Sequence, residues 1–195
     1  MKKLKTTDIL GQELPVLRVS GVSVLPPPLF VLNRHLPYLV GFMRSIIVGE
    51  LNVRRLHGLY PHVNALLHTR FSGGTDAEEL FAAVAEYLIF IRETIPQLPY
   101  CAAPHIADDG EDGYAFPLFT SSEKLVSDYA NLPLTDVYRL NYVDFLILRR
   151  EAFIYGISRT KKGREKLEEA YCREQTQPDR ARLRSRFGGE SDGEQ

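Results

Sequence analysis

Residues 141–188 read NYVDFLILRREAFIYGISRTKKGREKLEEAYCREQTQPDRARLRSRFG, and this stretch decides the fold. Apolar residues fall on several faces of a helix predicted between Val137 and Ile157, so this helix should be central to the fold or to an oligomer interface. Thr160 is the expected N-cap of a charged outer helix ending at Glu174, and opposite charges recur there four residues apart. Thr176 and Asp179 then form a capping box for a last short helix that ends at Gly188.

The preceding chain supplies further helices and one small β element. Residues 16–25, VLRVSGVSVL, alternate and are rich in β-branched residues, which predicts a strand or a hairpin bent at Gly21. The following Pro26–Pro28 run is expected to be a rigid connector, with a polyproline ligand as the alternative. A buried helix is predicted from Leu36, with Pro37 in its first turn, and two short helices broken near Gly58 and Pro61 should follow.

The middle of the chain carries two more helix start signals. Thr75 and Glu78 form a capping box for a helix predicted to end at Ile95, and Thr120 with Glu123 repeats the pattern. The fold class is therefore mainly α with a small β element (α+β), with a helical C-terminal half around a buried central helix. We expect one domain over residues 1–195, with sub-regions 1–74, 75–136 and 137–188 and a flexible tail at 189–195.

Composition narrows the cellular setting. The chain has 195 residues, and its two cysteines show neither a disulfide framework nor zinc-ligand spacing, so a cytoplasmic location is predicted. Prolines and Arg18 interrupt any signal-peptide core, and the longest apolar run, residues 36–48, is too short for a membrane span. The histidines at 57, 62 and 68 lack the spacing of a metal site, and the acidic run 108–113 lacks the period of a calcium loop. No cofactor or metal is predicted.

Charge is strongly segregated along the chain although the net charge is −1. Residues 1–75 carry nine Lys/Arg and three Asp/Glu, residues 76–136 carry two and twelve, and residues 149–187 carry twelve and six. The acidic middle could pack beside the basic ends, or one basic region could stay exposed for an acidic partner. The predicted partner-binding residues are Arg180, Arg182, Arg184 and Arg186, with Arg149 and Arg150 as a second candidate.

A family resemblance rests on three motifs in the C-terminal stretch: FLxLRREAxIY, TxxGREKLE and QTxPDRxxLRxxFG. With these motifs, about a quarter of the chain resembles the helical part of tail-assembly-chaperone-like proteins of phages and prophages of Gram-positive bacteria. The resemblance implies a cytoplasmic, non-enzymatic protein that holds tail-tube or tape-measure components during assembly. It carries over no residue-level role, and the β- and Pro-rich N-terminal half departs from an all-helical chaperone.

Three function classes follow. The leading hypothesis is a non-enzymatic factor that binds a protein partner, with an oligomer as one form and no contact with a membrane. The second is a nucleic-acid-binding protein that uses the C-terminal arginines on phosphates, although the sequence pI near 6.5 is low for that class. The third is an enzyme of unrecognised class, because no known catalytic motif is present and scattered residues could still form a site.

Overall fold

The computed structural model describes residues 7–49, 53–102, 104 and 121–173. The mainly α prediction with a small β element is confirmed. The elements are β1 (Leu17–Val19), β2 (Val22–Val24), α1 (Leu29–Ile47), α2 (Val53–Leu67), α3 (Ala77–Ile89), the π-helical turn η1 (Phe90–Thr94), α4 (Ser122–Ala130), α5 (Leu134–Val137) and α6 (Tyr142–Ser158). Residues 161–173 are also helical.

The chain divides into two compact units. The first comprises Met1–Ala102 and Ser121–Arg150, and the second comprises Ala103–Thr120 and Glu151–Gln195. One contiguous apolar core, running from Leu14 to Ile147 in sequence, lies entirely within the first unit. The boundary therefore falls within α6, just after the part of the helix that contributes to this core.

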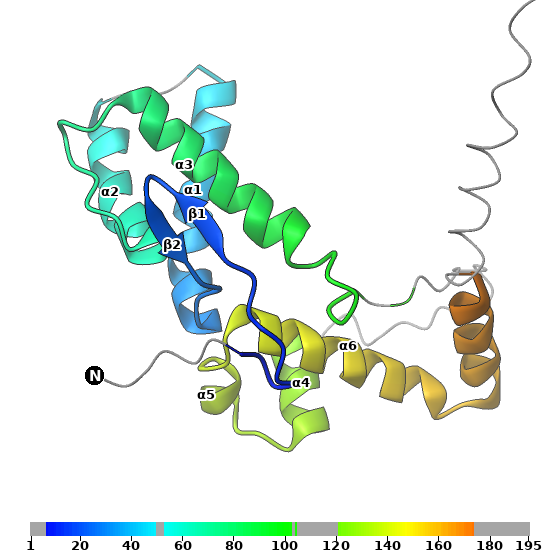
Figure 1. Ribbon diagram of the computed structural model, residues 1–195. Helices are drawn as coiled ribbons and strands as arrows, with labels where there is room; N and C mark the ends of the chain where they lie inside the picture. Colours follow the sequence, from blue (N-terminus) through cyan, green and yellow to red (C-terminus); the bar gives the residue numbers. More distant parts are fainter. Residues whose placement is uncertain (1–6, 50–52, 103, 105–120, 174–195) are drawn as a thin grey trace, which may run out of the picture. The chain divides into compact units, whose positions relative to one another are not determined.

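The predicted hairpin at residues 16–25 is present. β1 and β2 pair antiparallel with Leu17 opposite Val24 and Val19 opposite Val22. The two turn residues, Ser20 and Gly21, have φ values of 46° and 74°, as a two-residue hairpin turn of the right twist requires. Val19 and Val24 are buried, and the hairpin packs on α3 and α2 (Figure 1).

The proline run joins the hairpin to the helices through backbone hydrogen bonds. The Pro27 carbonyl accepts from the Tyr142 amide at 2.9 Å, and Pro28 forms an antiparallel bridge with Asn141. The Leu29 amide then donates to the Leu140 carbonyl at 2.8 Å. The run is thus a connector, as predicted, and it joins the start of α1 to the start of α6.

Both proline-containing helices differ from their predictions. α1 begins at Leu29, and Leu29 and Leu32 are buried on the same face as Leu39. Pro37 therefore lies in the interior of the helix and not in its first turn. The two short helices predicted around Pro61 are one continuous helix, α2. An interior proline removes one backbone hydrogen bond, and here the packing of α1 on α2 offsets that loss.

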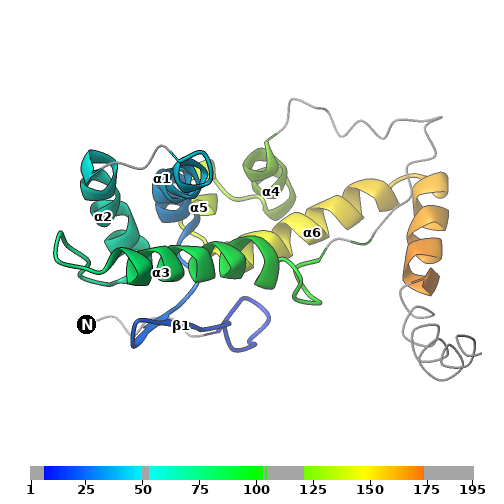
Figure 2. The same ribbon diagram turned by 90° about the horizontal axis from the view of Figure 1, so that it is seen from above.

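α3 crosses α1 and supplies much of the core (Figure 2). Its N-cap is Asp76, whose side chain accepts from the Glu78 amide at 3.3 Å, so the predicted cap at Thr75 was one residue early. The hydrogen bond from the Ile95 amide to the Phe90 carbonyl spans five residues, and the helix therefore ends in the π turn η1. Five apolar residues of α3 and of the segment that follows it are buried: Leu80, Val84, Tyr87, Ile91 and Ile95.

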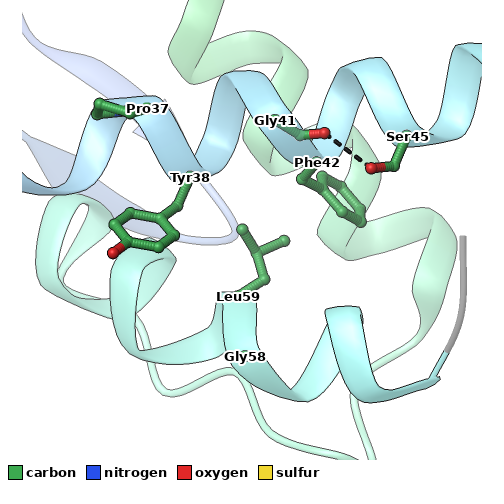
Figure 3. Close-up of a pocket in the computed structure, with 7 residues that line it drawn as sticks. All are labelled: Pro37, Tyr38, Gly41, Phe42, Ser45, Gly58 and Leu59. Atoms are coloured by element: carbon green, nitrogen blue, oxygen red, sulfur yellow. Dashed lines mark hydrogen bonds between the residues drawn. The ribbon is translucent and has the colours of Figure 1, made fainter.

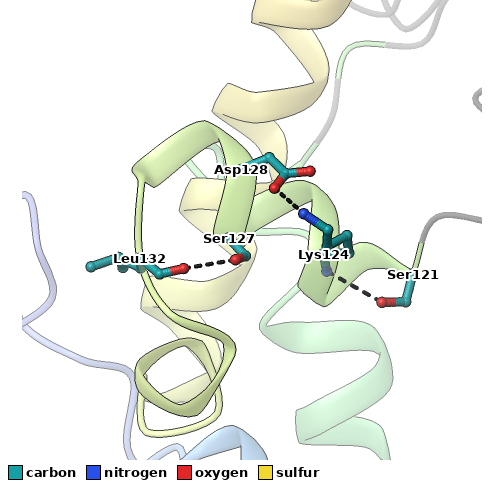
Figure 4. Close-up of polar contacts among 5 residues, drawn as sticks. All are labelled: Ser121, Lys124, Ser127, Asp128 and Leu132. Carbon is teal, nitrogen blue, oxygen red and sulfur yellow. Dashed lines mark hydrogen bonds and ion pairs between the residues drawn. The ribbon is translucent and has the colours of Figure 1, made fainter.

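α4 is closed at both ends by side chains (Figure 4). The Ser121 hydroxyl accepts from the Lys124 amide at 3.2 Å, so Ser121 is the N-cap in place of Thr120, which lies outside the described residues. At the other end Asn131 adopts the left-handed conformation with φ 52°, and the Ser127 hydroxyl donates to the Leu132 carbonyl at 2.7 Å. An ion pair between Lys124 and Asp128 lies on the outer face.

The helix predicted between Val137 and Ile157 corresponds to α6, which begins later, at Tyr142, and a separate short helix, α5, precedes it. Asn141 is its cap: the Asn141 side-chain oxygen accepts from the Asp144 amide at 2.9 Å, and its side-chain nitrogen donates to the Asp144 carboxylate at 2.6 Å. Residues 143–147 are all buried. Apolar side chains around the whole circumference thus place this part of the helix inside the first unit.

In the second unit, the turn after α6 is organised as predicted around Thr160. The Thr160 hydroxyl accepts from the Gly163 amide at 3.0 Å and starts the helical residues 161–173. Two predicted ion pairs are present, Lys161 with Glu165 at 3.9 Å and Glu169 with Arg173 at 3.4 Å. Arg164, predicted to pair with Glu168, donates to the Ser158 carbonyl at 2.9 Å.

Candidate functional site: a groove between α1 and α2

An apolar groove of about 400 Å³ lies between α1 and α2 within the first unit. Figure 3 shows Tyr38 and Phe42 from α1 and Leu59 from α2 pointing into the space between the two helices. The lining is completed by Pro37, Gly41, Ser45 and Gly58. Tyr38 is 55% exposed, so one wall of the groove is an aromatic face that solvent reaches.

Two of the residues that line the groove are glycines in helix interiors. Gly41 is in the interior of α1 and Gly58 is in the interior of α2, and a Cβ atom built on either would meet nothing within 4 Å. Neither position has the positive φ that would require glycine. A glycine in a helix interior costs about 0.5–1 kcal/mol relative to alanine. Each helix therefore carries glycine at a lining position where alanine would fit and would favour the helix.

A histidine pair lies at the Tyr38 end of the groove. The Nδ1 atoms of His35 and His62 are 2.9 Å apart, so one ring donates its proton to the other. The Tyr38 ring stacks on His62, with ring centroids 3.6 Å apart. Burial lowers the pKa of both histidines, and the positive charge of Arg34 lowers it further. The pair is therefore neutral at pH 7 and links α1 to α2.

A second polar cluster is buried where the N-terminal loop meets α6. Asp8 and Asp144 are 2% and 4% exposed. The Asp8 carboxylate accepts from the amides of Leu10 and Gln12, and the Asp144 carboxylate accepts from the Ile9 amide at 2.8 Å. These charge-assisted bonds fold the loop and fix it on the start of α6. The cluster is therefore an anchor for the loop.

The predicted partner-binding arginines are not brought together by the described structure. Arg149 and Arg150 are half-buried, and the Arg150 Nε atom donates to the Ala102 carbonyl at 2.9 Å. Arg180, Arg182, Arg184 and Arg186 lie outside the described residues, so their partner-binding role stays a prediction. The capping box at Thr176 and the acidic loop at 108–113 lie outside them as well.

The groove was missed at the sequence level. Its lining comes from two helices and includes glycine, proline and serine, which form no apolar stripe that a helical period would reveal. The His35–His62 contact joins residues 27 positions apart, and only His62 belonged to the histidine group considered in the sequence. The one available signal was a glycine inside each helical pattern, which often has a packing or functional reason.

Comparison with known proteins adds no family assignment. No protein-family model, curated protein or solved structure matches the chain significantly. Within the described residues, no three His, Cys, Asp or Glu side chains are arranged to hold a metal ion. Among those same residues, no helix combines the length and apolar character needed to cross a bilayer.

Proposed function

We propose that this protein is a non-enzymatic binding factor, and that the groove between α1 and α2 receives an apolar segment of a partner protein. The observation that carries the proposal is the pair of helix glycines, Gly41 and Gly58, at positions where alanine would fit. Residues at functional sites are often less stabilising than the alternatives that would fit there, because function depends on them. A docking site needs an open apolar groove, and glycine in place of alanine is consistent with such a groove even though it lowers the stability of each helix.

The lining favours docking over chemistry. Its side-chain polar groups are the Tyr38 and Ser45 hydroxyls, and Ser45 donates to the Gly41 carbonyl at 2.9 Å (Figure 3). Amphipathic helices commonly bind by laying their apolar side chains into a groove of this kind between two helices. A volume of about 400 Å³ accommodates a few such side chains.

The resemblance of residues 141–188 to tail-assembly-chaperone-like proteins suggests the biological setting. We propose that the partner is a component under assembly, such as a tail-tube or tape-measure protein, which the groove holds until it is incorporated. The nucleic-acid-binding alternative rests on the four C-terminal arginines, and the same experiment tests it.

The test is affinity capture of the tagged protein from its native host, with nuclease-treated and untreated lysates compared side by side. Gly41→Leu fills the groove, and Val40→Leu adds apolar surface at a neighbouring exposed position of α1 outside the lining. We expect a few defined proteins to be recovered with the wild type and with Val40→Leu, independently of nuclease, and to be lost with Gly41→Leu.

Two results would count against the proposal. Recovery of the same proteins with Gly41→Leu would show that the groove is not their binding site. Recovery of nucleic acid and nuclease-sensitive proteins alone would favour the phosphate-binding alternative. Circular dichroism of each variant, compared with the wild type, establishes that the helices are intact.

A further inference from the structure

The charged residues on the two helices that form the groove are all basic. Neither α1 nor α2 contains an Asp or Glu residue. Arg34 lies one turn before Tyr38, Arg44 lies three residues after Gly41, and Arg54 lies one turn before Gly58, so each is close to a lining residue on its own helix. All three arginines are exposed. An apolar centre is therefore bordered by cations from both helices.

From this arrangement we infer that the segment which docks in the groove is an acidic amphipathic helix of the partner protein. This inference rests on the proposed function and specifies the chemistry of the partner. Apolar side chains at i, i+3 or i+4, and i+7 of such a helix would contact Tyr38, Phe42 and Leu59. Its carboxylates would lie opposite the arginines at the edge.

The arginines set the specificity of this interaction. Exposed ion pairs contribute little affinity each, whereas like charges placed against each other are unfavourable, so the arginines discriminate mainly against basic helices. A long-range attraction of this kind also accelerates association and is screened by salt.

The inference is tested with three synthetic helical peptides of about 18 residues that share one apolar stripe and carry Glu, Gln or Lys at the remaining positions. Their binding to the full-length protein is measured by fluorescence anisotropy at low and high salt. We expect the Glu peptide to bind at least about tenfold more tightly than the Lys peptide at low salt, and this ratio to fall at high salt.

Two double variants identify the arginines responsible. Arg34→Glu with Arg54→Glu should remove or reverse the preference for the Glu peptide. Arg18→Glu with Arg139→Glu makes the same change of charge at exposed positions on β1 and after α5, and should leave the preference intact. Gly41→Leu should abolish binding of every peptide that the wild type binds.

Three outcomes would overturn the inference of an acidic partner helix. Equal binding of the Glu and Lys peptides, an equal effect of the two double variants, or no peptide binding at all would do so. If capture from the host still depends on Gly41 in any of these cases, the proposed function stands and only the acidic partner is wrong. If the wild type is a dimer in sedimentation analysis and Gly41→Leu is a monomer, the groove binds a second copy instead.

Discussion

Gly163 is fixed by the shape of the turn that follows α6. A Cβ atom at this position would lie 2.0 Å from the Ile157 carbonyl oxygen and 2.8 Å from the Thr160 hydroxyl, which is closer than non-bonded atoms approach. The Gly163 amide donates to that same hydroxyl. Any side chain at residue 163 therefore pushes against the atoms that start the next helix.

We expect Gly163→Ala to destabilise the helical residues 161–173, with an overpacking cost of about 1–3 kcal/mol. Hydrogen exchange should show faster exchange of the amides in this helix, while the amides of α1 and α3 stay protected as in the wild type. Gly41→Ala is the matched control, since it introduces the same methyl group into open space. Unchanged exchange in residues 161–173 would contradict the close approach to Ile157.

The two cysteines should differ sharply in reactivity. Cys101 is 2% exposed, and burial, with a further contribution from Asp8, raises the pKa of its thiol to about 11. Cys172 is exposed. Because the thiolate is the reactive form, Cys101 should stay protonated and inert at pH 8 in the folded protein.

A chromogenic disulfide reagent measures this difference. We expect one thiol to react rapidly in the native protein and two after unfolding, and we expect Cys172→Ser to show no rapid reaction until it is unfolded. Rapid labelling of native Cys172→Ser would mean that the surroundings of Cys101 open readily.

Single residues also show where local sequence rules stop. The cap at Thr160 was predicted from residue type, whereas Asp76 and Ser121 are the caps in place of neighbouring threonines that satisfy the same rule. Two adjacent cap-forming residues compete, and only the tertiary path of the chain selects between them. The buried pair Asp8 and Asp144 is 136 positions apart and leaves no local pattern at all.

The packing of α1 on α2 should weaken in acid because of the histidine pair. The pKa of both His35 and His62 is lowered from 6.5, so the folded state binds fewer protons than the unfolded state below that pH. The stabilisation is therefore complete above pH 6.5 and is lost as the pH falls below it. Protonation of both rings would also place two positive charges in contact beside Arg34.

We expect the melting temperature to fall between about pH 7.5 and pH 5, and to fall less in His62→Gln than in the wild type. His57→Gln is the control, since His57 is exposed on the same helix and contacts Tyr60 instead of His35. An equal loss of stability in wild type and His62→Gln would assign the acid sensitivity to other groups.

The same two helices mark the limit of what periodicity predicts. The hairpin, α3 and the central part of α6 were visible from alternation, capping and apolar residues on every face. α1 and α2 contain Pro37 and Pro61, which normally end helices, and here the burial of Leu39, Phe42, Leu59 and Val63 sustains both helices through them. The groove depends on these helices, so the site could not be placed before their packing was known.

The partner-binding residues were predicted at the C-terminal arginines because segregated charge can be seen in a sequence. An apolar groove between two helices cannot. The structure shows an apolar groove in the first unit, for which we propose a binding role, and the arginine prediction stays open. The groove lies in the first unit, whereas the four C-terminal arginines belong to the stretch Glu151–Gln195 of the second. A variant that removes one unit and keeps the other can therefore decide between them.

A chain ended after Ile154 should keep the first unit folded and the groove intact. Among the described residues, the last buried member of its apolar core is Ile147, with Leu148 packed against it, and the extra turn of α6 preserves the helix up to Arg150. We expect the melting temperature to change by no more than about 4 °C, which corresponds to about 1 kcal/mol in a domain of this size. Circular dichroism should show the loss of helical signal that removal of residues 155–195 accounts for.

The truncated chain then separates the two binding surfaces. It lacks Arg180, Arg182, Arg184 and Arg186, so retention of the captured partner, still sensitive to Gly41→Leu, would assign binding to the groove. Changing these four arginines to Glu in the full-length chain should then leave capture unchanged. Loss of the partner in both the truncated chain and the four-residue variant, with the melting temperature unchanged, would assign binding to the arginines and overturn the groove as the main site.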